Sequence, residues 1–413
     1  MLANNPLGGI LTTLLERRPF GRRPEDGAKI IENCQTLLAK KTDGSGLHVA
    51  TSILNQYHLL DDDQKIAFFT YLNDELDLDA DALVELAKGY AAEPSAVNFR
   101  ALSKGSTTTR QKLFWRLNGA EGATSEIVKM RKDLLAFRKA MPELGRTDHD
   151  LVQLLRTWFN RGFLVMRQIT WDSPASILEK IIAYEAVHQI QTWDDLRRRL
   201  HPKDRRLFAF FHPSMPDEPL IFVEVALTKG IPNSIQTVLS DTREPIEAED
   251  ADTAVFYSIS NCQPGLAGIS FGNSLIKQVA RDLAMELPNI KTFVTLSPIP
   301  GLTRWMGKIG VTPSADDPEL LAKLAAKYLL EAKKADGQPL DPVSRFHLGN
   351  GAMVHAVHPG ADISDNGMAQ SAGVMVNYLY DLNRIPQNVV TFSETQEVIA
   401  TAALKSLAKK VAA

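Results

Sequence analysis

The sequence predicts an α+β protein, in which an all-helical N-terminal domain is followed by a mixed α/β domain. Apolar residues recur at helical spacing through the first 165 residues. Near Thr170 the pattern changes, and runs of branched and aromatic residues that are typical of strands begin. A chain of 413 residues is also long for a single hydrophobic core, so we predict two domains, residues 1–165 and 166–413.

Composition restricts the classes of partner. The chain carries 46 lysines and arginines against 49 acidic residues, for a formal net charge of −3. Proteins that bind nucleic-acid phosphates usually have a clear basic excess, so we expect no nucleic-acid partner. A local basic patch for a small polyphosphate ligand stays open.

Cysteine content and hydropathy point to a cytoplasmic protein without a membrane partner. Cys34 and Cys262 are too few for a disulfide framework or a cysteine-based zinc site, which favours a reducing cytoplasm. No apolar run reaches the roughly 18–20 residues that span a bilayer. Residues 1–23 lack the basic and apolar regions of a secretory signal.

The first domain is predicted to consist of amphipathic helices. Residues 61–63 offer N-caps for one of them, and a further helix is expected over 151–163, with Trp158 buried. The clearest helix has apolar residues at alternating steps of three and four and is closed by Pro142: Ile127, Met130, Leu134, Phe137 and Met141. Core packing is the main interpretation of these stripes, with a subunit interface as the alternative. A helical module without a catalytic cluster often serves assembly, so we expect homo-oligomerisation through this domain.

The second domain is predicted to open with a helix over 175–184, capped by Ser173 with Pro174 at its first position. Arg197, Arg198 and Arg199 are interpreted as a solvated helix face. Strands are expected over 207–211 and 219–227, followed by an acidic surface loop at 240–252.

Residues 254–301 form a predicted strand–loop–helix–strand unit. An apolar strand over 254–260 leads into a turn-rich loop, a helix that ends before Pro288, and a second strand over 292–296. The two strands should be parallel, because a helix connects them. Gly265, Gly268 and Gly272 stand just ahead of the helix, where a backbone can approach an anion and helix N–H groups are free. We expect this loop to bind a phosphate or pyrophosphate. The alternative is that the glycines only form a tight turn before the helix.

Several motifs, in order and at compatible spacing, resemble the malonyl-CoA decarboxylase family. The resemblance covers most of residues 170–385 and, more loosely, the helical first part. The motifs are residues 212–216 (HPSMP) with 218–220 (EPL), 256–260 (FYSIS), the glycine-rich loop, 296–301 (LSPIPG), 346–352 (FHLGNGA) and 376–380 (VNYLY).

The resemblance implies a catalytic domain similar to GNAT-type acyltransferases and conversion of malonyl-CoA to acetyl-CoA and CO2, a step of fatty acid metabolism. No metal or other cofactor is needed in principle, because the thioester accepts the charge that CO2 leaves behind. In this fold the glycine-rich loop binds the CoA pyrophosphate, and the corresponding residues here are Ala267, Gly268, Ile269, Ser270, Phe271, Gly272 and Asn273. Relatives can carry glutamine and glutamate where this chain has Ala267 and Ser270. That difference leaves the role of the backbone N–H groups intact.

Ser297 and His347 are the predicted catalytic pair. By residue type alone, a serine before Pro298 is a turn residue, and a lone histidine at a predicted strand start is a structural hydrogen bonder. The resemblance instead implies that Ser297 hydrogen-bonds the malonyl carboxylate or acts with a histidine, and that His347, with a pKa near neutrality, donates the C2 proton. Asn377 and Tyr380 are second-rank candidates near the thioester.

Four alternatives stay open. His355 and His358 have i, i+3 spacing and could bind a metal, although no third ligand accompanies them. Arg197, Arg198 and Arg199 could contact a CoA phosphate instead of solvent. The scaffold could also serve an acyltransferase that needs an amine acceptor, or a non-catalytic CoA-responsive protein that would not need Ser297 and His347.

Overall fold

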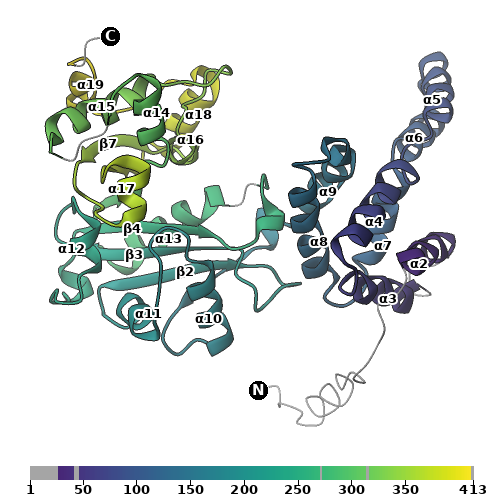
Figure 1. Cartoon of the computed structure of the whole chain (residues 1–413), viewed down its shortest axis with the longest axis horizontal. Coiled ribbons are helices and arrows are strands. Elements are labelled where there is room, and N and C mark those ends of the chain that lie inside the picture. Colours follow the sequence, from purple (N-terminus) through teal and green to yellow (C-terminus); the bar gives the residue numbers. More distant parts are fainter. Residues whose placement is uncertain (1–26, 41–45, 270–271, 313–315, 411–413) are drawn as a thin grey trace. The chain divides into compact units, whose positions relative to one another are not determined.

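The computed structural model describes residues 27–40, 46–269, 272–312 and 316–410 (Figure 1). The chain divides into two compact units between Leu155 and Arg156. The described part of the first unit contains only helices, and the second combines a mixed sheet with helices. The predicted fold class, a helical first part followed by a mixed α/β part, is therefore confirmed. None of the described helices has the length and apolar character needed to cross a membrane.

The helices of the first unit differ from the predicted ones mainly at their ends. Asp61 caps its helix in a reciprocal capping box with Gln64. The helix predicted to include Met141 ends at Phe137, because Pro142 opens a short 3₁₀ turn, and the helix predicted to begin at residue 151 begins at Gly145. Trp158, expected to be buried, is only half-buried. The elements are α2 (Gly27–Ala39), α3 (Leu47–Tyr57), α4 (Asp62–Asp74), α5 (Ala80–Ala92), α6 (Ala96–Gly105), α7 (Thr109–Leu117), α8 (Ala123–Phe137), η2 (Pro142–Leu144) and α9 (Gly145–Trp158).

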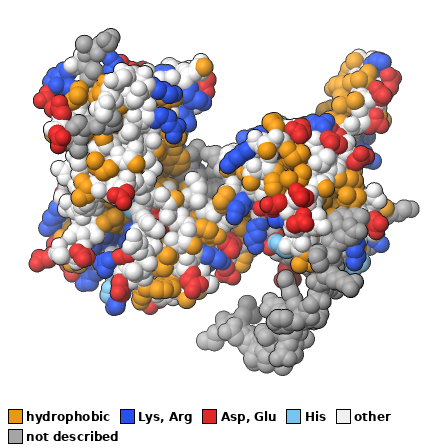
Figure 2. Space-filling model, viewed as in Figure 1, with side chains coloured by type: hydrophobic (Ala, Val, Ile, Leu, Met, Phe, Trp, Pro, Cys, Tyr) orange, Lys and Arg blue, Asp and Glu red, His pale blue; other side chains and the backbone are white. Residues whose placement is uncertain are grey.

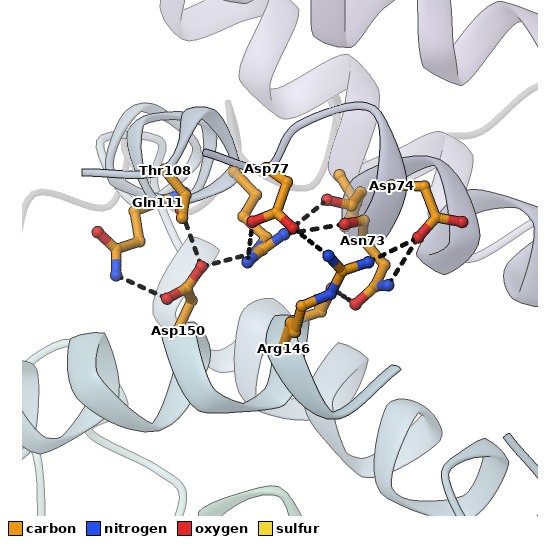
Figure 3. A network of polar contacts seen from close by, with 10 residues as sticks. Asn73, Asp74, Asp77, Thr108, Gln111, Arg146 and Asp150 are labelled. Carbon is orange, nitrogen blue, oxygen red and sulfur yellow. Dashed lines mark hydrogen bonds and ion pairs between the residues drawn. The ribbon is translucent and has the colours of Figure 1, made fainter. Parts of the chain in front are cut away.

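A buried ionic network joins the helices of this unit (Figure 3). The Arg110 guanidinium, 3% exposed, pairs with Asp150 of α9 and, at 2.8 Å, with Asp77. It also donates to the backbone carbonyl of Asn73 at 3.1 Å. Asp150 accepts further hydrogen bonds from Thr108 and Gln111, each at 2.8 Å. Because each buried charge has a partner, the network tolerates its removal from water.

The α5–α6 hairpin leaves apolar residues uncovered. Neither helix has a buried residue. Val97 is 65% exposed and Phe99 57%. Figure 2 shows hydrophobic side chains gathered on this hairpin, which Figure 1 labels. Apolar surface of this kind commonly marks an interaction site.

The second unit is built on an eight-stranded sheet in which strands follow the order β1-β2-β3-β4-β5-β8-β6, and β7 pairs with β8. Its strands are β1 (Val165–Ile169), β2 (Arg205–Phe211), β3 (Ile221–Thr228), β4 (Thr253–Asn261), β5 (Thr292–Thr295), β6 (Ser297–Pro298), β7 (Met353–His358) and β8 (Met375–Leu379). Its helices are η3 (Arg161–Phe163), α10 (Ala175–Tyr184), α11 (Trp193–Leu200), α12 (Ile235–Leu239), η4 (Ala248–Asp250), η5 (Pro264–Leu266), α13 (Gly272–Glu286), α14 (Leu302–Lys308), α15 (Pro318–Glu331), α16 (Pro342–Gly349), α17 (Asp365–Ser371), α18 (Ile385–Thr395) and α19 (Ala402–Ala408).

Two predictions for the start of this unit are wrong. Pro174, not Ser173, occupies the N-cap position of α10, because the Ser173 hydroxyl instead accepts a hydrogen bond from the backbone N–H of Thr170 at 3.0 Å. Arg199 does not belong to a solvated face: its side chain is buried and donates to the fully buried Glu224 at 3.1 Å. A buried carboxylate on β3 needs a cation, and the last turn of α11 supplies one.

The predicted βαβ unit is present, and its strands are parallel as expected. β4 and β5 pair from Thr253–Thr292 to Phe256–Thr295. One further bond, from the N–H of Leu296 to the carbonyl of Phe256 at 3.0 Å, ends the ladder. Beyond it β4 continues to Asn261, whereas the other strand turns into β6 and pairs with β8. The two strands therefore part, and backbone groups of β4 lose their partner on that side.

Candidate active site

A cavity of about 240 Å³ lies where β4 and β5 part. The cavity is enclosed by Val187, by β4 and β6, and by α16. The lining residues on these elements are Phe256, Tyr257, Ile259 and Asn261 of β4, Ser297 and Pro298 of β6, and Pro342, Val343, Phe346 and His347 of α16. Most of these side chains are apolar, and Ser297 and His347 bring the polar atoms that the sequence predicts to be catalytic. Apolar pockets with a few converging polar groups are typical of small-molecule sites.

Ser297 is held by the strand that leaves the β4–β5 ladder. It is 6% exposed, and its hydroxyl donates to the hydroxyl of Thr295 at 2.8 Å. The turn that follows packs tightly, because a Cβ on Gly301 would lie 2.1 Å from the Tyr328 hydroxyl. Only glycine lets the turn after Ser297 approach α15 this closely.

His347 lies in the last turn of α16, so the prediction that it stands at a strand start is wrong. Asp341 caps this helix by accepting from the N–H of Ser344 at 2.8 Å, and Pro342 occupies the first turn. The aspartate–proline pair is a helix-start signal in the sequence itself. α16 places His347 Nε2 at 3.2 Å from Ser297 Oγ, so the two residues predicted to act together do meet.

Burial sets the protonation state of His347. The imidazole is 2% exposed, and loss of hydration lowers its pKa to about 3. The expected pKa near neutrality is therefore wrong, and His347 is uncharged at pH 7. Since Ser297 donates its hydrogen to Thr295, Ser297 Oγ accepts from His347, which places the imidazole proton on Nε2.

Tyr380 completes a hydrogen-bonded chain. Its hydroxyl lies 2.8 Å from His347 Nδ1. With the proton of the imidazole on Nε2, Nδ1 is an acceptor and Tyr380 is its donor. Burial raises the pKa of Tyr380 well above its usual value, which keeps the phenol protonated. The Tyr378 ring stacks on the imidazole at a centroid distance of 4.4 Å and fixes its plane.

Asn377, the other second-rank candidate, does not contact the pair directly. Its amide donates to the carbonyl of Thr295 at 2.7 Å, and its oxygen bonds His358 Nε2. Thr295 also accepts from the N–H of Tyr378 at 3.1 Å. Asn377 thus supports the strand that carries Ser297. Thr295, Tyr378 and Asp341 were missed by sequence reasoning, and only Asp341 has a local signal, the helix start.

The glycine-rich loop is only partly available for an anion. The N–H groups of Ala267 and Ile269 already donate to the carbonyls of Pro264 and Leu266, at 3.1 and 3.0 Å. Gly268 adopts a φ of +78°, which favours glycine, and its N–H makes no bond within the described residues. Gly272 and Asn273 begin α13 through their backbone, and Ser270 and Phe271 lie outside the described residues.

No group of three or more metal-ligating side chains comes together within the described residues. His355 and His358 lie on β7, and His358 bonds Asn377. His212, the first residue of the 212–216 motif, is engaged as well: it bonds the carbonyl of Trp158 at 3.0 Å and accepts from Ser214 N at 3.1 Å.

The lowered pKa of His347 predicts an acid-sensitive fold. In the unfolded chain a histidine takes up a proton near pH 6.5, but the folded protein delays this until about pH 3. Stability should therefore fall as pH drops between these values, by up to about 1.4 kcal/mol per pH unit for this residue. Urea unfolding from pH 7 to 4 should show a shallower loss for His347→Gln than for wild type. The same substitution at exposed His201 is the control, and equal slopes for His347→Gln and wild type would contradict the prediction.

Comparison with known proteins agrees with these features. The family model for the malonyl-CoA decarboxylase C-terminal domain matches residues 162–318 and 312–413. The model for the N-terminal domain of the same family matches residues 77–159. Between them these matches cover the glycine-rich loop, Ser297, His347 and Tyr380.

Individual relatives are similar over most of the chain. A protein from Anser anser anser named malonyl-CoA decarboxylase, mitochondrial, is 36% identical over 341 residues, which are 70% of this chain and 67% of the relative. Crystal structures of malonyl-CoA decarboxylases from Rhodopseudomonas palustris and Agrobacterium vitis are 46% and 44% identical, each with a TM-score of 0.87. They cover 93% and 92% of this chain, and 100% and 99% of their own chains are matched. The resemblance found in the sequence is thus confirmed: the chain belongs to the malonyl-CoA decarboxylase family.

Proposed function

We propose that this protein converts malonyl-CoA to acetyl-CoA and CO2 and that Ser297, His347 and Tyr380 carry the polar part of the reaction. The observation that supports the roles most directly is the buried chain from Tyr380 through His347 to Ser297, which ends in the cavity between β4 and β5. Family membership supports the substrate.

Loss of CO2 leaves two electrons on C2 of the thioester, which delocalise onto its carbonyl oxygen as an enolate. C2 must then gain one proton, so one proton is consumed per turnover. Ser297 brings its hydroxyl to the cavity, and we assign it contact with the malonyl group. When Ser297 passes its proton to C2, His347 Nε2–H is placed to restore it while the Tyr380 hydroxyl gives its proton to Nδ1, so the imidazole stays neutral. A proton from water then restores the Tyr380 phenol and balances the cycle.

An uncharged His347 suits this role. A permanent imidazolium would stabilise the malonyl carboxylate and hold back its departure as CO2, whereas a neutral relay favours the enolate, which gains a hydrogen bond as charge moves. Tyr380 acts on Ser297 only through His347, which makes it a positioning residue: its hydroxyl holds the tautomer in which Nε2 is the donor.

The direct test is to mix purified protein with malonyl-CoA and follow acetyl-CoA and CO2, without added amine and after exhaustive treatment with EDTA. We expect full turnover, because the thioester can carry the negative charge without a metal. Activity that requires an amine acceptor would favour an acyltransferase. Activity lost to EDTA and rescued by a divalent ion would favour a metal site at His355 and His358.

We also propose that a second copy of the chain covers the α5–α6 hairpin, which would give the predicted oligomerisation through the helical domain. The support is the exposure of Val84, Val97 and Phe99 on helices without one buried residue. Val97→Lys with Phe99→Lys should lower the molar mass measured by light scattering during size-exclusion chromatography. An unchanged mass would reject this face as the interface.

Cytoplasmic location stays a prediction. Both cysteines are free and buried, as a reducing compartment allows, whereas the relative from Anser anser anser is named a mitochondrial protein. Imaging of the tagged protein in its source cells, or cell fractionation, would decide between the two.

A further inference from the structure

Three cations of the second unit lie near the glycine-rich loop, and none has an acidic partner among the described residues. Lys277 and Arg281 are four residues apart on α13, so they share one face of the helix. Arg161 of η3 lies close enough that its charge, with that of Arg281, adds to half-burial in lowering the pKa of Lys277. No carboxylate lies within ion-pair distance of these three cations among the described residues.

The arrangement costs stability in the absence of a ligand. Like charges at i, i+4 destabilise a helix, and a half-buried ammonium needs a counter-charge. The acids of α13, Asp282 and Glu286, come later in the helix, and Glu286 pairs with Arg206 at 3.1 Å instead. Lys277 and Arg281 thus form a destabilising like-charge pair next to the glycine-rich loop. Such a local departure from what stabilises a helix is expected at a functional site, here one where an anionic ligand supplies the missing negative charge.

The ligand must be anionic and must reach both the loop and the middle of α13. Lys277 and Arg281 follow Gly272 by five and nine residues, or roughly 8 and 14 Å along the helix axis. CoA carries two anionic groups on one ribose, the pyrophosphate at the 5′ oxygen and a separate phosphate at the 3′ oxygen. If the pyrophosphate lies at the N–H of Gly268, the 3′-phosphate is the second anion that can reach the cluster.

We propose that Arg161, Lys277 and Arg281 bind the 3′-phosphate of CoA and thereby select CoA thioesters over those that lack this phosphate. The inference rests on the proposed function, because it takes CoA as the ligand. It differs from the alternative in which Arg197, Arg198 and Arg199 contact a CoA phosphate, and of those three Arg199 is already paired with Glu224 and Arg198 with Asp195.

Titration calorimetry with CoA and 3′-dephospho-CoA tests the proposal, because the two ligands differ only in the phosphate concerned. Wild-type protein should bind CoA at least roughly tenfold more tightly, the size expected for one or more charge-assisted contacts. The variant Lys277→Met with Arg281→Met should bind the two ligands within about twofold of each other, by weakening CoA alone. Lys291→Met, which removes an exposed charge beyond the other end of α13, should keep the wild-type preference.

Two results would overturn the proposal: equal binding of both ligands by wild-type protein, or an equal loss for both ligands in the double variant. Either can occur while CoA still binds and malonyl-CoA is still decarboxylated, which leaves the proposed function intact. If wild-type protein binds neither ligand, the proposed function is rejected, and the assignment of the 3′-phosphate to the three cations is rejected with it.

Discussion

His347→Ala and Ser297→Ala should each lower kcat far more than they raise KM. The two side chains act in the cavity where the strands part, whereas CoA is assigned to the glycine-rich loop and α13, so ground-state affinity should be largely spared. General acid–base contributions are typically about 10²–10⁴-fold, which sets the expected loss in kcat for His347→Ala. The measurement is steady-state kinetics of acetyl-CoA formation at saturating and limiting malonyl-CoA.

The double variant and Tyr380 sharpen this test. Ser297 and His347 are joined by one hydrogen bond, so the double variant should be little worse than the worse single one. Tyr380→Phe removes only the donor to Nδ1 and should cost less than His347→Ala, again in kcat. His201→Ala, at an exposed position, controls for the substitution. Near-wild-type kcat for folded His347→Ala would refute the assignment and make Tyr380 the candidate proton donor.

Element type and order could be predicted from the sequence because local patterns encode them. The βαβ unit shows this: two apolar strands around an amphipathic helix suffice to predict a parallel pair. The ends of elements could not be predicted as well, since they depend on tertiary contacts. Ser173 looks like a cap by type, but its hydroxyl is engaged by Thr170, and Arg199 looks solvated until Glu224 of a distant strand is seen to need a cation.

The residues of the candidate site could be identified from the sequence, but their environment could not. Ser297, His347 and Tyr380 were singled out through a resemblance to a family, since no local pattern separates them from turn and core residues. The pKa of His347 could not be predicted, because burial depends on α16, β6 and β8 closing around it. Thr295 and Tyr378 carry no signal of their own, and their roles follow from hydrogen bonding and ring stacking between strands and helix. The clustering of Lys277 with Arg161 likewise joins segments far apart in sequence.

Arg110→Ala should destabilise the helical unit by about 3–5 kcal/mol, because it leaves Asp150 buried without its cation. Arg146→Ala is the matched control (Figure 3): Arg146 also pairs with Asp77, but its side chain is 56% exposed, so its loss should cost less than about 1 kcal/mol. Urea unfolding of the full chain by circular dichroism gives the midpoints, and hydrogen exchange in α7 and α9 shows whether the loss is in this unit. Similar costs for the two substitutions would mean that water or a rearranged Gln111 replaces Arg110, and that the network specifies helix positions without stabilising them.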